Sequence, residues 1–247
     1  MVRKILILGH RGYRKKFPEN TILSFTKAFE FRADGLECDI QRSSDGVYFV
    51  FHDMDMERLT GISGDINSFT ADRIKSMKVA GKERIQDIDS FLALLPDNKF
   101  INIELKEETL TIDDSNILID KLNKRRTSCD ILISSFNHAL LPPFKKAGYK
   151  TGMLYETETF KNHPLKNIIG IFLHRPWSVN IYIGLFAEPQ TLLLRAFAAA
   201  ARLLRIKFIF WTVNNADQFN AVKDIAHAII TDEVEELVRI RADSCTV

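Results

Sequence analysis

Short apolar runs alternate with longer segments of helical periodicity along almost the whole chain of 247 residues. The runs fall at residues 4–8, 35–40, 47–51, 100–105, 129–134, 150–155, 168–173, 207–213 and 227–231. Segments with apolar residues at helical spacing lie between them, for example at 20–32, 115–126, 189–204 and 232–242. Strand–helix alternation over one domain length predicts a parallel sheet covered by helices.

The number of runs favours a closed barrel over an open sheet. If 47–51 extends the region of the second strand and is not itself a barrel member, eight strand–helix steps remain. That count predicts an α/β fold, a (β/α)8 TIM barrel. No G-x-G-x-x-G motif follows the first strand, which argues against a dinucleotide-binding fold. Residues 54–87 are rich in Gly, Ser, Asp and Lys, and we interpret them as a small insertion after the second strand of a single domain spanning 1–247.

Composition limits which binding partners and which cellular compartment we expect for this protein. Thirty-four basic and 32 acidic residues leave a net charge of +2, which is too balanced to favour a nucleic-acid partner. The odd set Cys38, Cys129 and Cys245, without C-x-x-C spacing, is typical of reduced thiols in a cytoplasmic protein. The N-terminal apolar run is too short for a signal peptide, and no uncharged apolar segment reaches the roughly 18 residues of a membrane span. We therefore expect a cytoplasmic protein, and the sequence carries no signal for an oligomeric state.

Ionisable side chains collect where the predicted strands end. They are His10, Arg11, Glu37, Asp39, His52, Asp53, Glu104, Lys106, His174, Arg175 and Asp232. In a TIM barrel the carboxyl ends of the strands share one rim, and active sites are built there. A single histidine or carboxylate at a strand end is usually structural, but at least five such ends on one rim indicate chemistry.

Three carboxylates at this rim suggest a metal site. Glu37 and Asp39 are two residues apart, so on a strand they point to the same face, and Glu104 ends a later strand. Hard oxygen ligands without cysteine favour Mg²⁺ or Ca²⁺ over zinc. The alternative is an ion network in which Glu37 and Glu104 pair with Arg11 and Lys106, and both interpretations can hold in part.

The cations and histidines point to a phosphorylated substrate. The guanidinium of Arg11 offers a planar fork to phosphate oxygens, and Lys106 adds a point charge. Cleavage of a phosphodiester needs a base for the attacking oxygen and an acid for the departing one. Because histidine titrates near neutral pH, His10 and His52 could divide these two roles.

The segments "GHRGYRKKFPENTILSF", "LECDIQRSSDGVYFVFHDMDMERLTG", "INIELK", "SSFNHALL", "FWTVNN" and "AIITD" together resemble the glycerophosphodiester phosphodiesterase family, in the usual order, from Gly9 to about Glu235. The resemblance implies a (β/α)8 barrel with an insertion after the second strand. It also implies a divalent metal, Mg²⁺ or Ca²⁺, and hydrolysis of glycerophosphodiesters to glycerol 3-phosphate and an alcohol. Matched residue by residue, it implies acid/base histidines at His10 and His52, metal carboxylates at Glu37, Asp39 and Glu104, phosphate-binding cations at Arg11 and Lys106, and a glycerol-pocket aromatic at Trp211.

Two other functions remain open at this point. One is a phospholipase D-type hydrolase acting on lysophospholipids, and the other is a barrel that binds glycerophosphodiesters without turning them over. A binding-only relative should have lost one of the proposed catalytic or metal residues, whereas all of them are present. The apolar segment 176–186 follows the run that we expect to end at His174. It either packs on neighbouring helices or forms an apolar lip that favours acyl-bearing substrates or rests on a membrane surface.

Overall fold

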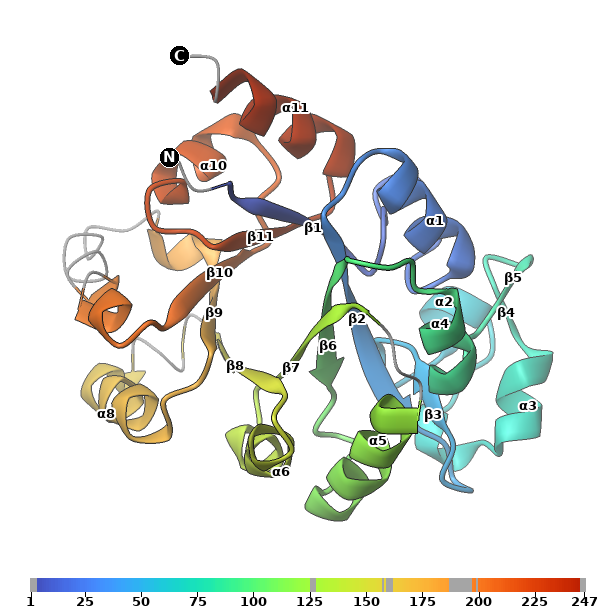
Figure 1. The fold of residues 1–247 in the computed structure, drawn as a ribbon. Helices are drawn as coiled ribbons and strands as arrows, with labels where there is room; N and C mark the ends of the chain where they lie inside the picture. The colour runs from blue at the N-terminus through green and yellow to red at the C-terminus, as the bar shows by residue number, and fades with distance from the viewer. Residues whose placement is uncertain are drawn as a thin grey trace.

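Eight parallel strands close into a barrel in the computed structural model, which describes residues 4–124, 128–156, 158, 162–186, 197–198 and 200–244 (Figure 1). The strands are β1 (Leu6–His10), β2 (Gly35–Arg42), β6 (Phe100–Leu105), β7 (Asp130–Ser135), β8 (Lys150–Tyr155), β9 (Ser178–Tyr182), β10 (Lys207–Trp211) and β11 (Ala228–Thr231). Each pairs with the next strand of this series, and β1 also pairs with β11 to close the ring. The predicted (β/α)8 fold is confirmed.

Helices form an outer ring around the strands (Figure 1). They are α1 (Ile22–Glu30), α4 (Ile88–Leu94), α5 (Ile112–Lys124), α6 (Leu141–Lys146), α8 (Pro164–His174), α10 (Ala216–Val222) and α11 (Val234–Ser244), and residues 200–203 are also helical. Short 3₁₀ turns η2 (His138–Leu140) and η3 (Ile183–Phe186) follow β7 and β9. Capping side chains explain where several helices begin. Thr21, for example, accepts a hydrogen bond from the Ser24 N–H in a capping box at the start of α1.

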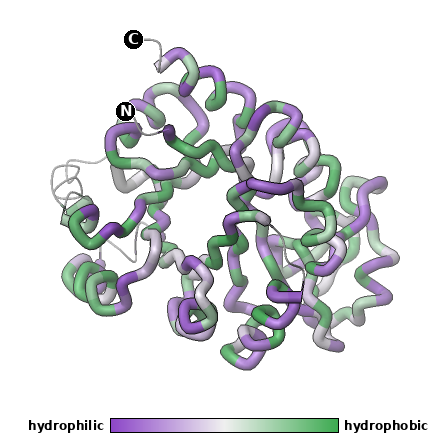
Figure 2. Tube along the Cα trace, viewed as in Figure 1, coloured by the Kyte–Doolittle hydropathy of each residue, from purple (hydrophilic) through white to green (hydrophobic). Residues whose placement is uncertain are grey.

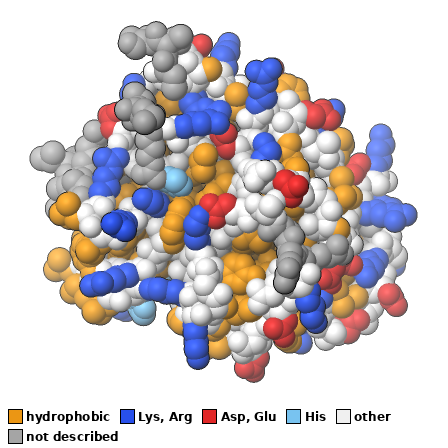
Figure 3. Space-filling model, viewed as in Figure 1, with side chains coloured by type: hydrophobic (Ala, Val, Ile, Leu, Met, Phe, Trp, Pro, Cys, Tyr) orange, Lys and Arg blue, Asp and Glu red, His pale blue; other side chains and the backbone are white. Residues whose placement is uncertain are grey.

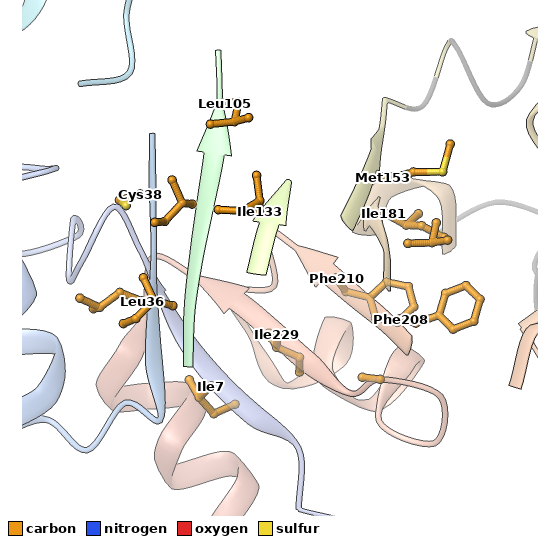
Figure 4. Close-up of a cluster of buried hydrophobic side chains, with 14 of the residues drawn as sticks. Ile7, Leu36, Cys38, Leu105, Ile133, Met153, Ile181, Phe208, Phe210 and Ile229 are labelled. Atoms are coloured by element: carbon orange, nitrogen blue, oxygen red, sulfur yellow. The ribbon is translucent and has the colours of Figure 1, made fainter. Parts of the chain in front are cut away.

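The alternation of side chains along each strand divides the core into two parts. The larger part lies between the strands and the helices, where side chains such as Ile7, Leu36, Ile133 and Phe210 are fully or almost fully buried (Figure 4). Residues that alternate with these point into the barrel and fill its lower half; they are Leu8, Phe100, Leu132, Ile209, Ala228 and Ile230. Figure 2 shows mostly hydrophobic strands and helices that alternate between hydrophobic and hydrophilic residues.

The chain leaves the barrel after β2 and forms a small separate layer. Strand β3 (Tyr48–Val50) pairs antiparallel with β2 outside the closed ring, as predicted for 47–51. The elements α2 (Glu57–Thr60), η1 (Ile66–Ser68), α3 (Ala71–Ser76), β4 (Lys78–Val79) and β5 (Glu83–Arg84) follow. Their apolar side chains form a cluster of their own, which includes Phe49, Phe51, Met56, Ile66 and Ile74. The insertion after the second strand therefore has a local core.

The predicted sixth strand, 168–173, is wrong. These residues lie inside α8, and the sixth strand of the barrel is β9. Pro164 is suited to the first turn of a helix, and apolar side chains three or four residues apart pack against the barrel, among them Ile171. Strand β9 was hard to recognise because Asn180 points into the barrel and interrupts its apolar pattern. His174 and Arg175 consequently lie at the end of an outer helix and not on the rim where strands end.

Within the described residues, no helix combines the length and the apolar character that crossing a bilayer requires. Cys38 is buried and Cys129 is half-buried, and neither forms a disulfide. Cys245 and most of the predicted helix 189–204 fall outside the described residues.

Candidate active site

A cavity of about 280 Å³ opens at the carboxyl ends of the barrel strands. Its lining residues are His10, Arg11, Glu37, His52, Asn102, Glu104, Lys106, Phe136, Leu154, Glu156, Trp211 and Ile230. Seven of the eight predicted site residues are in this set. The eighth, Asp39, is 1% exposed and contacts two lining residues, Arg11 and Lys106. The structure therefore brings all eight together.

The three predicted carboxylates come from two neighbouring strands. Glu37 and Asp39 lie on β2, and Asp39 is in register with Glu104 of β6. One carboxylate oxygen from each lies within 4.8 Å of the others. Burial, together with the charges of Asp39 and Glu104, raises the pKa of Glu37 well above its usual range. Burial and the Asp39 charge raise the pKa of Glu104 to about 7.

This cluster fits a divalent cation. Its donors are hard oxygens that lie close together, and after burial their mutual repulsion is the next cause of the raised pKa values of Glu37 and Glu104. The buried amide of Asn20 donates from Nδ2 to Asp39 at 3.0 Å, and its Oδ1 has no hydrogen-bond partner among the described residues. Glu37, Asp39 and Glu104 are the residues that could hold the metal.

Both predicted cations are tied to acidic side chains. Arg11 Nη1 donates to Glu19 at 2.8 Å, and its Nε lies 3.4 Å from Asp39. Lys106 Nζ donates to Glu104 at 2.9 Å. Burial would raise the pKa of Asp39, but the charges of Arg11, His52 and Lys106 lower it to about 2. The ion-network interpretation therefore holds in part, since Glu104 does pair with Lys106. The side chain of Arg11, however, pairs with Glu19 and Asp39, and Glu37 accepts a hydrogen bond from the backbone N–H of Arg11 but none from its guanidinium.

The backbone after β1 is bent sharply to place Arg11. Arg11 has φ +54° and Gly12 has φ +84°. A Cβ atom on Gly12 would lie 2.4 Å from Ser24 Oγ, so this position requires glycine. The Asn20 N–H closes the loop by donating to the Arg11 carbonyl at 2.9 Å.

Each histidine is held through Nδ1 by an aspartate. His10 Nδ1 lies 2.7 Å from Asp232 Oδ1, and His52 Nδ1 lies 2.8 Å from Asp53 Oδ1. Because a carboxylate only accepts, we assign the proton to Nδ1, which leaves Nε2 of both rings available. Burial is the largest effect on both rings and lowers the pKa of each.

The insertion stabilises the position of His52 through Asp53. Arg58 of α2 donates to Asp53 through Nε at 2.5 Å and to Glu19 through Nη2 at 2.7 Å. Gln41 Nε2 donates to the backbone carbonyls of His52 and Asp53. Glu19 thus connects the loop after β1 to the insertion, because it accepts from both Arg58 and Arg11.

Two aromatic residues, Phe136 and Trp211, line the cavity. The ring of Trp211 lies 5.3 Å from that of Tyr182 and 5.8 Å from that of Phe136, between centroids. Trp211 Nε1 is buried and has no hydrogen-bond partner among the described residues. Neither amide atom of Asn102 has a partner there either, although the residue is 1% exposed and lines the cavity.

Three polar residues of this site are not among the predicted site residues. Asp232 was recognised at a strand end but given no role, and Glu19 lies inside the "PEN" motif. Asn102 stands two residues before Glu104 on the same strand face. The two-residue spacing that singled out Glu37 and Asp39 could have found it.

A model of the glycerophosphoryl diester phosphodiesterase family matches residues 10–236. The chain belongs to this family. A curated glycerophosphodiester phosphodiesterase of Caldanaerobacter subterraneus subsp. tengcongensis is 30% identical, over 96% of this chain and 98% of that relative. The crystal structure of a glycerophosphodiester phosphodiesterase from Thermotoga maritima is 29% identical, with a TM-score of 0.82 over 96% of this chain and 98% of that one.

A third relative shares the fold at lower identity. The Oleispira antarctica phosphodiesterase, solved with the product sn-glycerol-3-phosphate, is 20% identical with a TM-score of 0.84, covering 96% of both chains. The predicted membership of the phosphodiesterase family, and with it the prediction of an enzyme, is confirmed.

For most of the segment 176–186, the structure contradicts the apolar-lip alternative and favours packing within the fold. Trp177 directly precedes β9, at the end of the barrel far from the cavity, and its ring packs 5.0 Å from His227 and 5.7 Å from Phe100. Residues 178–182 form β9 itself. Tyr182 does reach the rim beside Trp211, whereas the side chains of Leu185 and Phe186 are outside the described set.

Proposed function

We propose that this chain hydrolyses glycerophosphodiesters to glycerol 3-phosphate and an alcohol, in a reaction that depends on Mg²⁺ or Ca²⁺. The observation that carries the proposal is the pairing of two aspartate-held histidines with a carboxylate cluster in one cavity. Family membership and the 30% identical relative support the choice of substrate class.

The metal site in this proposal consists of Glu37, Asp39 and Glu104. A bound divalent cation would supply positive charge to the phosphate oxygens. Arg11 and Lys106 lie beside the same cavity and would bind and orient the phosphate through charge-assisted hydrogen bonds.

His10 and His52 would share the proton transfers. One imidazole, neutral and unprotonated at Nε2, removes the proton from the attacking oxygen. The other, protonated on both ring nitrogens, delivers its Nε2 proton to the oxygen of the departing alcohol as the P–O bond breaks. Their aspartate partners keep both rings in a fixed orientation. Trp211 would line the glycerol pocket, where its indole N–H, which has no partner among the described residues, can donate to a hydroxyl.

The test measures glycerol 3-phosphate released from glycerophosphocholine, with and without chelator. Activity should disappear in chelator and return with Mg²⁺ or Ca²⁺. His10→Ala and His52→Ala should each lose about 10²-fold or more in kcat, since a general acid or base typically contributes that much. Full turnover in chelator would exclude the metal, and near-normal turnover of either variant would exclude that histidine.

The remaining expectations rest on this function. We propose that residues 1–247 act as one domain with an insertion near 54–87 and that the enzyme works in the cytoplasm on a small-molecule phosphodiester. Cell fractionation followed by the same assay tests the location, and recovery of activity in the membrane-enclosed or secreted fraction would contradict it.

A further inference from the structure

The outer helix α8 exposes a continuous apolar face. Leu165, Ile169 and Leu173 are 74%, 57% and 77% exposed. Side chains four residues apart lie above one another on a helix, so these three form a line along α8. Ile171 on the other side of the helix is fully buried against the barrel. The exposed line is therefore not needed to hold α8 in place.

The surface around this line carries mostly positive charge. Glu156 and Glu158 lie just before α8, Glu156 lines one cavity together with Lys166 of α8, and Lys150 pairs with Asp130. Residues 138–155, 162–186 and 200–207 contain no Asp or Glu, although the whole chain has 32 acidic residues. Their lysines and arginines are Lys145, Lys146, Lys150, Lys166, Arg175, Arg202, Arg205 and Lys207. Figure 3 shows hydrophobic side chains bordered by Lys and Arg over α8, at the lower left, without Asp or Glu beside them.

Neighbouring elements bring these charges next to the apolar line. Lys145 of α6 donates to the carbonyls of His174 and Arg175, which places the end of α6 against the end of α8. The ring of Phe197 packs 6.0 Å from that of Phe172 on α8, and the helical residues 200–203 that follow Phe197 in the chain bring two further exposed leucines, Leu203 at 86% and Leu204 at 43%. We call the surface formed by α8, the end of α6 and residues 200–205 the α8 face.

We propose that the α8 face docks on an anionic phospholipid surface. An apolar stripe bordered mainly by lysine and arginine has the composition of helices that lie in the membrane interface. At 11 residues, α8 is far too short to span a bilayer but can lie in its plane. Cations near such a surface are attracted by anionic headgroups.

A second copy of this chain is a poorer occupant. A two-fold symmetric contact brings the same patch of both subunits together, so it would set these cations against one another with few acidic partners. Charge complementarity therefore favours a negatively charged lipid surface over self-association.

The experiment is flotation of the purified full-length protein with phosphatidylcholine vesicles, prepared with and without phosphatidylglycerol. The protein should float with the anionic vesicles, and salt should weaken binding by screening. Leu165→Ser with Leu173→Ser should reduce the bound fraction at least about tenfold, since two apolar side chains leave the interface. The matched control changes Ile112 and Ile117 of α5 to Ser, which are 53% and 49% exposed, and should bind like wild type.

A charge variant tests the electrostatic part separately. Lys146→Gln with Arg205→Gln should weaken binding to anionic vesicles roughly 30-fold, at about fivefold for each charge. Lys82→Gln with Arg84→Gln, on the exposed hairpin of the insertion, is its control. All variants should keep the wild-type circular dichroism spectrum and turnover of glycerophosphocholine.

Three results would overturn the proposal. The first is absence of flotation with anionic vesicles, and the second is equal loss of binding in the control variants. The third is a dimer in sedimentation equilibrium that the Leu165 and Leu173 substitutions dissociate, combined with no vesicle binding. That outcome would assign the face to contact between copies. None of these results depends on whether the active site is hydrolytic.

Discussion

Asp232 should control the rate of the reaction through His10 without touching the substrate. Its Oδ1 lies 2.7 Å from His10 Nδ1, and the Asn214 amide holds the aspartate by donating to Oδ2 at 3.2 Å. The side chains of His10 and Asp232 are only 13% and 23% exposed, so water screens their interaction weakly. A hydrogen bond to a charged group contributes about 1.5–3 kcal/mol. If that energy orients the catalytic ring, Asp232→Ala should lower kcat about 10- to 150-fold.

The assay is steady-state release of glycerol 3-phosphate from glycerophosphocholine. The loss should fall on kcat, with KM little changed, because Asp232 does not line the cavity. Asp232→Asn can still accept through its amide oxygen but lacks the charge, so it should lose less than the alanine variant. Asp217→Ala, an exposed acid on α10, is the control. If Asp232→Ala keeps kcat within about twofold of wild type while its melting temperature is unchanged, the orienting role is wrong.

Three further predictions concern the metal site, the core and acid stability. Glu104→Gln should weaken Mg²⁺ or Ca²⁺ binding in calorimetry with little change in urea unfolding, because a rim carboxylate supports binding more than packing; unchanged affinity would remove Glu104 from the ligand set. Leu36→Ala, fully buried, should lower the free energy of unfolding by about 2–5 kcal/mol, whereas Leu94→Ala, half exposed, should cost less than about 0.5 kcal/mol; similar costs would contradict the placement of the core. Burial raises the pKa of Asp34, but hydrogen bonds from the Ile7 N–H and from two cationic side chains outweigh it and lower that pKa. The stabilisation that ionised Asp34 gives the folded state is therefore present above its ordinary pKa and is lost as the pH falls through the lowered value. Asp34→Asn should remove this loss, so the free energy of unfolding, measured by urea titration, should fall less steeply at acid pH.

The local pattern of the sequence was sufficient for the fold class and for most of the site. Alternating strand and helix segments leave few arrangements other than a parallel barrel, and in a barrel every strand delivers its last residues to the same rim. Because side chains alternate along a strand, the spacing of Glu37 and Asp39 already determined that they share a face. The position of Glu104 at the end of its own strand then brought it to the same place.

The sixth strand depended on tertiary structure. The segment 168–173 is as rich in apolar residues as a buried strand. In α8, however, some of these side chains pack against the barrel and others are exposed to solvent. Strand β9 has a polar residue, Asn180, inside the barrel, where Gly152 leaves room: a Cβ there would lie 3.1 Å from the Asn180 amide oxygen. Accommodation of a buried polar side chain by a neighbouring strand leaves no signal in the local pattern.

The contacts that hold the catalytic groups were also decided by the tertiary structure. Asp232 reaches His10 across 222 positions in the chain, and Arg58 reaches Glu19 from the insertion across 39. Periodicity along one segment reports only which face a residue occupies. The partner that it meets across a barrel is determined by how the strands close and where the loops return, because hydrogen bonds of under 3 Å depend on positions that distant segments set together.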